Sequence, residues 1–179
     1  SFFAGGGGSS AGYKLAGGDC KFVNEFQQVA VDTYLANWPN TPHICGDIKN
    51  VTGKQIMEMT GIQEGELDIL DGSPPCSAFS ISGKRDKGWD QEKEYSEGKK
   101  VENIEDLFLE YVRIAKEIKP KVIVAENVAG LTIGEAKEYY NKILNEFEKI
   151  GYDVCSQVMN SKNYGVSQTR TRVIFIGIR

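Results

Sequence analysis

A run of four apolar residues, Val122-Ile123-Val124-Ala125, constrains the fold more than any other feature of this sequence. Its length and composition are typical of a strand buried on both faces, as in parallel sheets. Residues 104–118 before it place their apolar side chains on one helical face, with Asn103 as the predicted N-cap, and Pro120 ends that helix. A helix followed directly by a buried strand indicates a βαβ arrangement.

The same alternation extends along the chain. Further strands are predicted at 20–24, 43–46, 67–71, 152–159 and 173–178, and further helices at 27–37, 53–59 and 135–150. Strands separated by helices of this length predict a mostly parallel sheet and the α/β fold class. At 179 residues, with 40% hydrophobic and 26% charged residues, the chain is expected to form one globular domain.

Composition argues against several classes of protein. No stretch approaches 18 consecutive apolar residues, so no membrane span is predicted. The four cysteines form no Cys-x-x-Cys pair and there is a single histidine, which argues against a zinc site and a secreted disulfide scaffold. Without a cationic, apolar leader, we expect a reduced, cytoplasmic protein that holds no metal. The net charge of −4 is unusual for a free-standing nucleic-acid module, although a local basic edge could still bind nucleic acid.

The first motif is the glycine run Phe3-Ala4-Gly5-Gly6-Gly7-Gly8. Glycines between a strand and a helix let a ligand approach the helix N-terminus, although a flexible linker explains the run equally well. Glu25 lies 20 residues past Gly5, the spacing at which an acid binds a ribose diol. Alternatively, Glu25 offsets the dipole of the next helix. Together they predict a nucleoside-bearing cofactor without separating NAD from S-adenosylmethionine.

Cys76 follows two prolines that end the strand 67–71. This position is a rigid turn at the carboxyl edge of the sheet, where open α/β folds bind their ligands, so the thiol is a candidate nucleophile. A small buried hydrophobe is the alternative. Cys20, Cys45 and Cys155 lie within or at the ends of predicted strands, and we interpret them as structural.

Three weaker motifs also lie at strand ends. Asp47 could accept a hydrogen bond from an adenine amino group, or it could be an ordinary turn aspartate. Glu126 comes immediately after the strand 122–125 and could hold a proton there, or cap the following turn. Gln168, Arg170 and Arg172 alternate along one side and could bind phosphate or base edges, unless they are simply a solvated strand entrance.

Residues 83–103 break the alternation, with twelve charged residues, three glycines and no apolar period. One interpretation is a solvated surface loop. The other is a mobile lid beside the Cys76 turn, because long loops in compact domains are often functional.

In this order, Phe-Ala-Gly-x-Gly-Gly, an acid, Gly-Asp-Ile, Pro-Cys, Glu-Asn-Val and Gln-x-Arg-x-Arg closely resemble the cytosine-C5 DNA methyltransferase family. The likeness covers essentially the whole chain and is greatest to the bacterial modification enzymes of restriction–modification systems. It implies a Rossmann-like methyltransferase fold with a mostly parallel, seven-stranded sheet that binds S-adenosylmethionine. It also implies double-stranded DNA as the partner.

The resemblance implies a role for each matching residue. It places Glu25 on the cofactor ribose and Phe26 on the adenine ring. The residues it assigns to cofactor binding are Phe3, Gly5, Gly7, Gly8, Glu25, Phe26, Asp47, Ile48 and Pro75.

The same resemblance makes Cys76 the nucleophile that adds to cytosine C6. Glu126 binds the N3/N4 edge of the base, while Arg170 and Arg172 bind its O2 and position the two catalytic side chains. The target cytosine must leave the base stack for this reaction, so the resemblance implies base flipping.

The sequence departs from the family pattern at Ser77, where glutamine usually follows Pro-Cys, and at Ser1, where aspartate is common. We expect a first strand trimmed before Ser1, and no target-recognition region or later motifs after Arg179. Residues 1–179 are therefore expected to be a monomeric catalytic domain that could be inactive alone. The alternatives are an RNA (tRNA) cytosine-C5 methyltransferase and a truncated, non-catalytic cofactor-binding domain. An amino-group DNA methyltransferase and a dehydrogenase explain fewer of the motifs.

Overall fold

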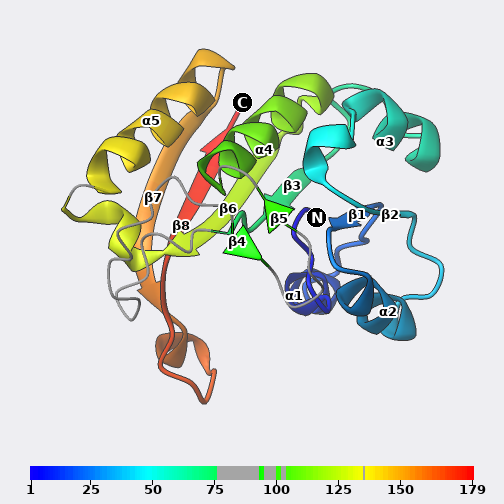
Figure 1. Ribbon diagram of the computed structural model, residues 1–179, viewed down its shortest axis with the longest axis horizontal. Coiled ribbons are helices and arrows are strands. Elements are labelled where there is room, and N and C mark those ends of the chain that lie inside the picture. Colours follow the sequence, from blue (N-terminus) through cyan, green and yellow to red (C-terminus); the bar gives the residue numbers. More distant parts are fainter. Residues whose placement is uncertain (76–92, 95–99, 102–103, 135) are drawn as a thin grey trace.

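The computed structural model describes residues 1–75, 93–94, 100–101, 104–134 and 136–179. Its central sheet consists of two ladders (Figure 1). The first is a parallel pair formed by β1 (Val23–Glu25) and β2 (His43–Cys45). The second has the order β3-β6-β8-β7 and is formed by β3 (Ile69–Gly72), β6 (Val122–Val128), β8 (Thr171–Ile178) and β7 (Asp153–Asn160). Phe2 joins the two ladders, since it bridges in parallel to Asn24 and to Gly72.

The sheet is mixed. β3 and β6 are parallel, whereas β8 is antiparallel to both β6 and β7. The prediction of seven, mostly parallel strands is therefore wrong for the described residues, which place six strands in these ladders with two parallel and two antiparallel pairings. The physical reason is the connection between β7 and β8, which has no α-helix to carry the chain back for a parallel pairing.

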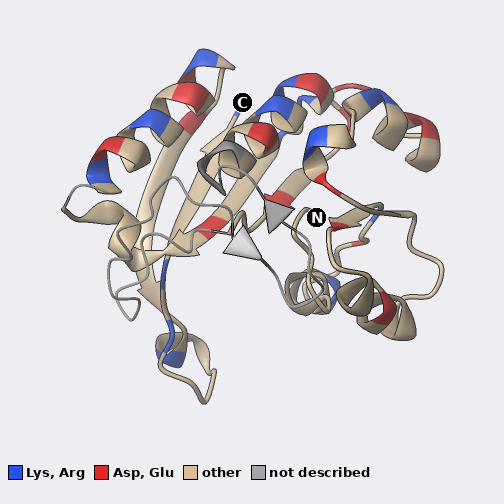
Figure 2. Cartoon of the chain, viewed as in Figure 1, with Lys and Arg blue, Asp and Glu red and all other residues tan. Residues whose placement is uncertain are grey.

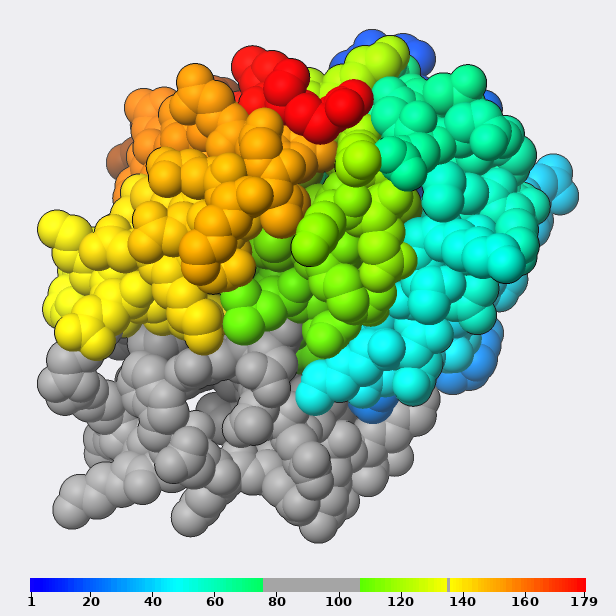
Figure 3. Space-filling view, turned by 90° about the horizontal axis from the view of Figure 1, so that it is seen from above, coloured from blue at the N-terminus to red at the C-terminus, as the bar shows by residue number. Residues whose placement is uncertain are grey.

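Helices cover the sheet in two groups. The helices are α1 (Gly8–Leu15), α2 (Gln28–Asn37), α3 (Gly53–Thr60), α4 (Ile104–Ile118) and α5 (Ala136–Lys149). α4 lies between α5 and α3 in one continuous layer, green between yellow and cyan in Figure 3. α1 and α2 lie at the β1–β2 end of the molecule (Figure 1). No helix in the described ranges is long and apolar enough to span a membrane.

Most predicted elements are confirmed, with shifted ends. α4 matches the predicted helix 104–118, whereas β6 continues to Val128 and so contains Glu126, which was predicted to follow the strand. Of the segment 83–103, the structure describes only a short antiparallel pair, β4 (Lys93–Glu94) with β5 (Lys100–Val101). The predicted N-cap Asn103 lies outside the described residues, as does most of the segment 83–103. The loop and lid interpretations of that segment therefore stay predictions.

Tyr111 of α4 ties the centre of the sheet together. It is fully buried, and its hydroxyl donates to the carbonyls of Leu70 in β3 (2.7 Å) and Val124 in β6 (3.1 Å). Burial, followed by the nearby Asp71 carboxylate, raises the pKa of Tyr111 well above its usual value. A Cβ atom at Gly72 would lie 2.7 Å from the Tyr111 ring, so only glycine fits there. α4 thus fixes the spacing between β3, which leads to the turn at Pro74-Pro75, and β6, which contains Glu126.

Candidate functional site

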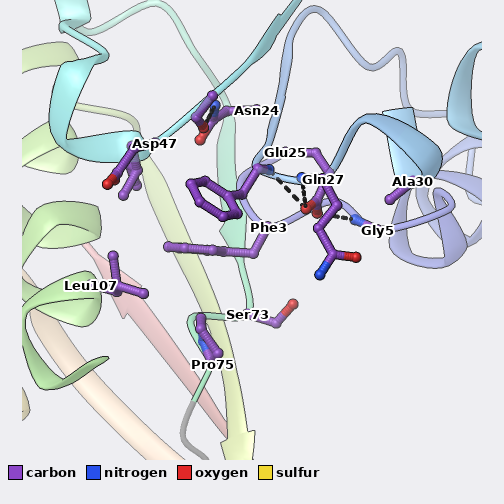
Figure 4. Close-up of a pocket in the computed structure, with 13 residues that line it drawn as sticks. Phe3, Gly5, Asn24, Glu25, Gln27, Ala30, Asp47, Ser73, Pro75 and Leu107 are labelled. Carbon is purple, nitrogen blue, oxygen red and sulfur yellow. Dashed lines mark hydrogen bonds between the residues drawn. The ribbon is translucent and has the colours of Figure 1, made fainter. Parts of the chain in front are cut away.

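An open pocket of about 250 Å³ lies beyond the carboxyl ends of β1, β2 and β3 (Figure 4). Its position in an α/β sheet is that of a small-molecule site. Seven of the nine residues predicted to bind the cofactor line it: Phe3, Gly5, Glu25, Phe26, Asp47, Ile48 and Pro75. The remaining lining residues were not predicted: Asn24, Gln27, Ala30, Gly46, Ser73 and Leu107. We call this cavity the Glu25 pocket.

Glu25 is held by three backbone hydrogen bonds. The Gly5 N–H donates to its Oε2 at 2.8 Å, and the N–H groups of Phe26 and Gln27 donate to its Oε1 at 2.8 and 3.0 Å. Because Gln27 is the N-cap of α2, the carboxylate also stabilises the start of that helix, as the alternative interpretation expected. An ionised carboxylate has about four acceptor positions, which leaves about one for a ligand hydroxyl.

The glycine run brings the backbone to the pocket through left-handed conformations. Phe3 has φ 55° and Gly5 has φ 52°. A non-glycine residue with positive φ is strained, and such strain is typical of functional sites. Gly7 and Gly8 do not line the pocket. Gly7 is the N-cap of α1 with φ 92°, and a Cβ atom there would overlap the Trp38 ring.

Asp47 shapes the opposite wall of the pocket. Its Oδ1 accepts the Lys49 N–H at 2.9 Å and caps the short 3₁₀ helix η1 (Ile48–Asn50). The turn-aspartate interpretation is therefore confirmed. Asn24, buried at the end of β1, supports the same wall, because its Nδ2 donates to the carbonyls of Ile44 and Gly46 at 3.0 Å.

Arg113 of α4 holds η1 from behind. Its Nη2 donates to the carbonyls of Ile48 (3.1 Å) and Val51 (2.8 Å), while its Nε and Nη1 donate to Glu110 and Glu117 at 2.6 and 2.7 Å. Partial burial lowers the pKa of Arg113, but the hydrogen bonds to the two glutamates outweigh it, so the pKa lies above its usual value. Arg113 was not predicted from the sequence, because no local sequence pattern indicates an arginine that binds distant carbonyls.

The groups in the Glu25 pocket fit an adenine nucleoside. Phe3 and Phe26 offer aromatic surface, and Ile48 and Leu107 offer aliphatic surface. The carboxylates of Glu25 and Asp47 come from different sides of the cavity (Figure 4), where one can accept from a ribose hydroxyl and the other from an amino group.

A second group of predicted residues meets further along the same edge of the sheet. Arg172 Nε lies 2.9 Å from Glu126 Oε1, and Arg170 Nη2 lies 3.5 Å from the same oxygen. The Glu126 side chain is 30% exposed, so a ligand can reach it. We call Glu126, Arg170 and Arg172 the Glu126 cluster. Gln168 does not share in these contacts; its carbonyl accepts from the Ser161 hydroxyl instead.

Asn127 connects the two regions. It is buried in β6, and its Nδ2 donates to the Pro74 carbonyl at 3.2 Å while its Oδ1 accepts the Val128 N–H at 2.8 Å. Pro75, the next residue, lines the Glu25 pocket. Cys76 lies outside the described residues, but the turn that leads to it is held on one side by Asn127 and faces the pocket on the other. A polar residue inside an apolar strand was the signal that could have predicted this role.

The other cysteines differ in their surroundings. Cys20 is partly buried and its Sγ accepts from the Tyr34 hydroxyl at 3.3 Å, in keeping with a structural role. Cys45 and Cys155 are exposed, which packing in the core does not explain. No cluster of histidine, cysteine, aspartate or glutamate suited to a metal ion occurs in the part of the chain that the structure describes.

Comparison with known proteins decides the family. The C-5 cytosine-specific DNA methylase family matches residues 1–179, the whole chain. The chain belongs to this family. Among its relatives are the type II methyltransferases M.DdeI of Desulfomicrobium norvegicum (37% identical over 180 residues) and M.XorII of Xanthomonas oryzae pv. oryzae (34% over 179 residues). These type II methyltransferases match 99% of the chain, whereas the chain spans 39% of the length of each.

Solved structures agree with the methyltransferase fold. A DNA modification methyltransferase encoded within an E. coli prophage superposes with a TM-score of 0.78 at 27% identity, over 99% of this chain and 45% of that one. The resemblance to cytosine-C5 DNA methyltransferases is therefore confirmed, and the α/β methyltransferase fold with it.

Proposed function

We propose that residues 1–179 form the catalytic domain of an enzyme that methylates C5 of a flipped-out cytosine in double-stranded DNA, using S-adenosylmethionine and a covalent bond between Cys76 and C6. The observation that carries the proposal is the turn at Pro74-Pro75: Pro75 lines the Glu25 pocket, and the Pro74 carbonyl accepts a hydrogen bond from Asn127, the residue next to Glu126. The reaction needs the methyl donor, the base and the nucleophile held close together in one site.

The Glu25 pocket would hold the adenosine part of the cofactor. Glu25 has an acceptor position left for a ribose hydroxyl, Phe3 and Phe26 would face the adenine, and Asp47 and Ile48 would contact its edge. S-Adenosylmethionine, when bound, supplies the methyl group that C5 takes up. Gly7 and Gly8 would contribute by shaping the loop before α1 rather than by lining the cavity.

The Glu126 cluster would activate the base. The Cys76 thiolate adds to C6, N3 gains a proton held by Glu126, and the displaced electron pair makes C5 nucleophilic. Arg170 and Arg172 would bind O2 and keep Glu126 in place, so that hydrogen bonds are ready for charge that develops during the addition. After C5 is methylated, loss of its proton to a base returns the electron pair, the thiolate leaves C6, and N3 gives its proton back to Glu126.

A trapping experiment tests the proposal. Duplex DNA with 5-fluorocytosine at the target position, incubated with the protein and S-adenosylmethionine, should give a covalent adduct, because fluorine at C5 cannot leave as a proton does. Mass spectrometry should place the adduct on Cys76. Cys155→Ala, which removes an exposed thiol of β7, is the matched control and should trap DNA like the unchanged chain.

Two results would contradict the proposal. One is an adduct that persists in Cys76→Ala. The other is trapping of a 5-fluorocytosine tRNA in place of the duplex, which would move the substrate to RNA. Binding of S-adenosylmethionine without any adduct would support the truncated, cofactor-binding alternative.

A further inference from the structure

The connection between β7 and β8 has a defined shape. Residues 161–170, which we call the 161–170 arm, project from the sheet beyond the helical layers (Figure 1). Ser161 closes the base of the arm with three hydrogen bonds: its N–H donates to the Arg170 carbonyl (3.0 Å), its hydroxyl donates to the Gln168 carbonyl (2.6 Å), and its Oγ accepts the Arg170 N–H (3.2 Å). Gly165, with φ 79°, ends the 3₁₀ helix η4 (Ser161–Tyr164) at the tip.

The arm and the strand that follows it are basic in an acidic chain. Residues 160–179 contain four of the 21 basic residues and none of the 25 acidic ones, so their net charge is +4 against −8 for residues 1–159. In Figure 2 the ribbon of the arm carries blue and no red, whereas α4 and α5 carry both colours. Lys162 is exposed and forms no ion pair with any residue that the structure describes.

The tip also presents apolar surface to solvent. Tyr164 is 62% exposed and Val166 is 50% exposed. Solvent-exposed apolar side chains alone are common. Here they lie beside Lys162 on a loop that its own hydrogen bonds hold in shape, which lowers the entropy lost when a ligand binds.

The position of the arm decides its partner. The pairing of Val128 with Arg172, and of Asn160 with Thr171, places the base of the arm at the edge of the sheet where β6 ends. Arg170, the last residue of the arm, contacts Glu126 directly. A cytosine at Glu126 would bring the DNA backbone on either side of it next to the arm, and basic and aromatic side chains are the usual contacts to phosphate and sugar.

We propose that the 161–170 arm binds the sugar-phosphate backbone of duplex DNA beside the target cytosine, with Lys162 contacting a phosphate and Tyr164 packing on a sugar. This inference rests on the proposed function and adds Lys162 and Tyr164 as contacts outside the Glu126 cluster. Lys162 acts by charge, so it contributes to affinity for any sequence and to the salt dependence of binding. Tyr164 acts by packing, so it contributes affinity with little salt dependence.

The test measures binding of a fluorescein-labelled duplex to the 179-residue chain by anisotropy, between about 50 and 200 mM salt. Lys162→Gln should lower the slope of log K against log salt by about one, because one phosphate contact is lost. The matched control Lys142→Gln, an exposed lysine of α5, should leave the slope unchanged. Tyr164→Ala should weaken binding about tenfold with the slope retained, a loss typical of one aromatic contact, and Tyr164→Phe should bind like the unchanged chain.

Equal slopes for Lys162→Gln and Lys142→Gln would overturn the inference, as would an unchanged chain that binds no duplex at the lowest salt. Tighter binding of a single-stranded RNA of the same sequence would overturn the choice of partner. The 5-fluorocytosine adduct, measured with the same variants, keeps the two hypotheses apart. If the adduct forms on Cys76 but Lys162→Gln and Lys142→Gln have equal salt slopes, the arm does not bind DNA as proposed, and the proposed function still stands.

Discussion

The Glu25 pocket and the Glu126 cluster both centre on a glutamate, but different forces hold the two carboxylates. Glu25 accepts three backbone N–H groups from residues at the ends of neighbouring elements. Glu126 meets the side chains of two arginines that are 44 and 46 positions away and are 51% and 25% exposed. The first arrangement is held by backbone groups, whereas the second depends on flexible side chains in contact with water.

This difference indicates how each region should respond to a ligand. Backbone donors cannot turn away, so the Glu25 pocket is already shaped for its ligand. Partly exposed ion pairs contribute only about 0–1 kcal/mol each, so the Glu126 cluster can rearrange around a base at little cost. Substitutions in the pocket should therefore lower the free energy of unfolding, whereas those in the cluster should lower activity with little effect on stability.

The largest expected effect is at Gly7. Gly7→Ala should lower the free energy of unfolding by about 3–5 kcal/mol, since the new methyl group overlaps Trp38 and φ is positive. Gly8→Ala is the matched control: nothing lies within 4 Å of its Cβ position, so the variant should be as stable as the unchanged chain or about 0.5–1 kcal/mol more stable. Urea unfolding measures both. Equal stabilities would show that the glycine run is not needed for packing.

Arg113→Met comes next. It removes the donors to the carbonyls of Ile48 and Val51, and we expect a loss of about 1–3 kcal/mol together with weaker binding of S-adenosylmethionine. Lys116→Met, on the exposed side of the same helix, should change neither quantity. Calorimetric titration of the cofactor is the measurement. Unchanged affinity in Arg113→Met would show that the contacts of Arg113 to η1 do not affect cofactor binding.

Glu25→Ala should lower the free energy of unfolding by about 1–2 kcal/mol, because three N–H groups lose their acceptor. The dissociation constant for S-adenosylmethionine should rise at least about tenfold, the equivalent of about 1.4 kcal/mol. Glu25→Gln keeps one acceptor oxygen, so its free energy of unfolding and its dissociation constant should lie between those of Glu25→Ala and the unchanged chain. If Glu25→Ala binds the cofactor as tightly as the unchanged chain, Glu25 only caps α2.

Glu126→Gln should have the smallest effect on stability, less than about 1 kcal/mol, because the contacts it weakens are partly exposed. Formation of the 5-fluorocytosine adduct should nevertheless slow by about 10²-fold, as for other preorganised groups that stabilise developing charge. Thermal unfolding and adduct formation, followed on the same samples, give the comparison. A large loss of stability with a normal adduct rate would reverse the contrast between the two regions.

The sequence predicted what local patterns determine. The apolar period over 104–118 predicts α4 in full, and the spacing from Gly5 to Glu25 predicts two residues that indeed share a hydrogen bond. Strand direction could not be predicted in this way, because an apolar run such as 173–178 is compatible with a parallel or an antiparallel sheet.

Long-range contacts of single side chains were also beyond the sequence. Asn127 and Pro74 are 53 positions apart, and Arg113 reaches carbonyls 62 and 65 positions away. No periodicity or spacing encodes such contacts. Glu126 and Asn127 were visible as a motif, but their position inside β6 depends on pairing with β8.

The hydrogen bond from Asn127 to Pro74 has a thermodynamic consequence. The turn at 74–75 belongs to the wall of the Glu25 pocket and is hydrogen-bonded to β6, the strand that contains Glu126. Under the proposed function, a methyl donor that shifts this turn would change the free energy of DNA binding at Glu126. Linkage would then make the effect reciprocal, with each ligand altering the affinity for the other by the same factor.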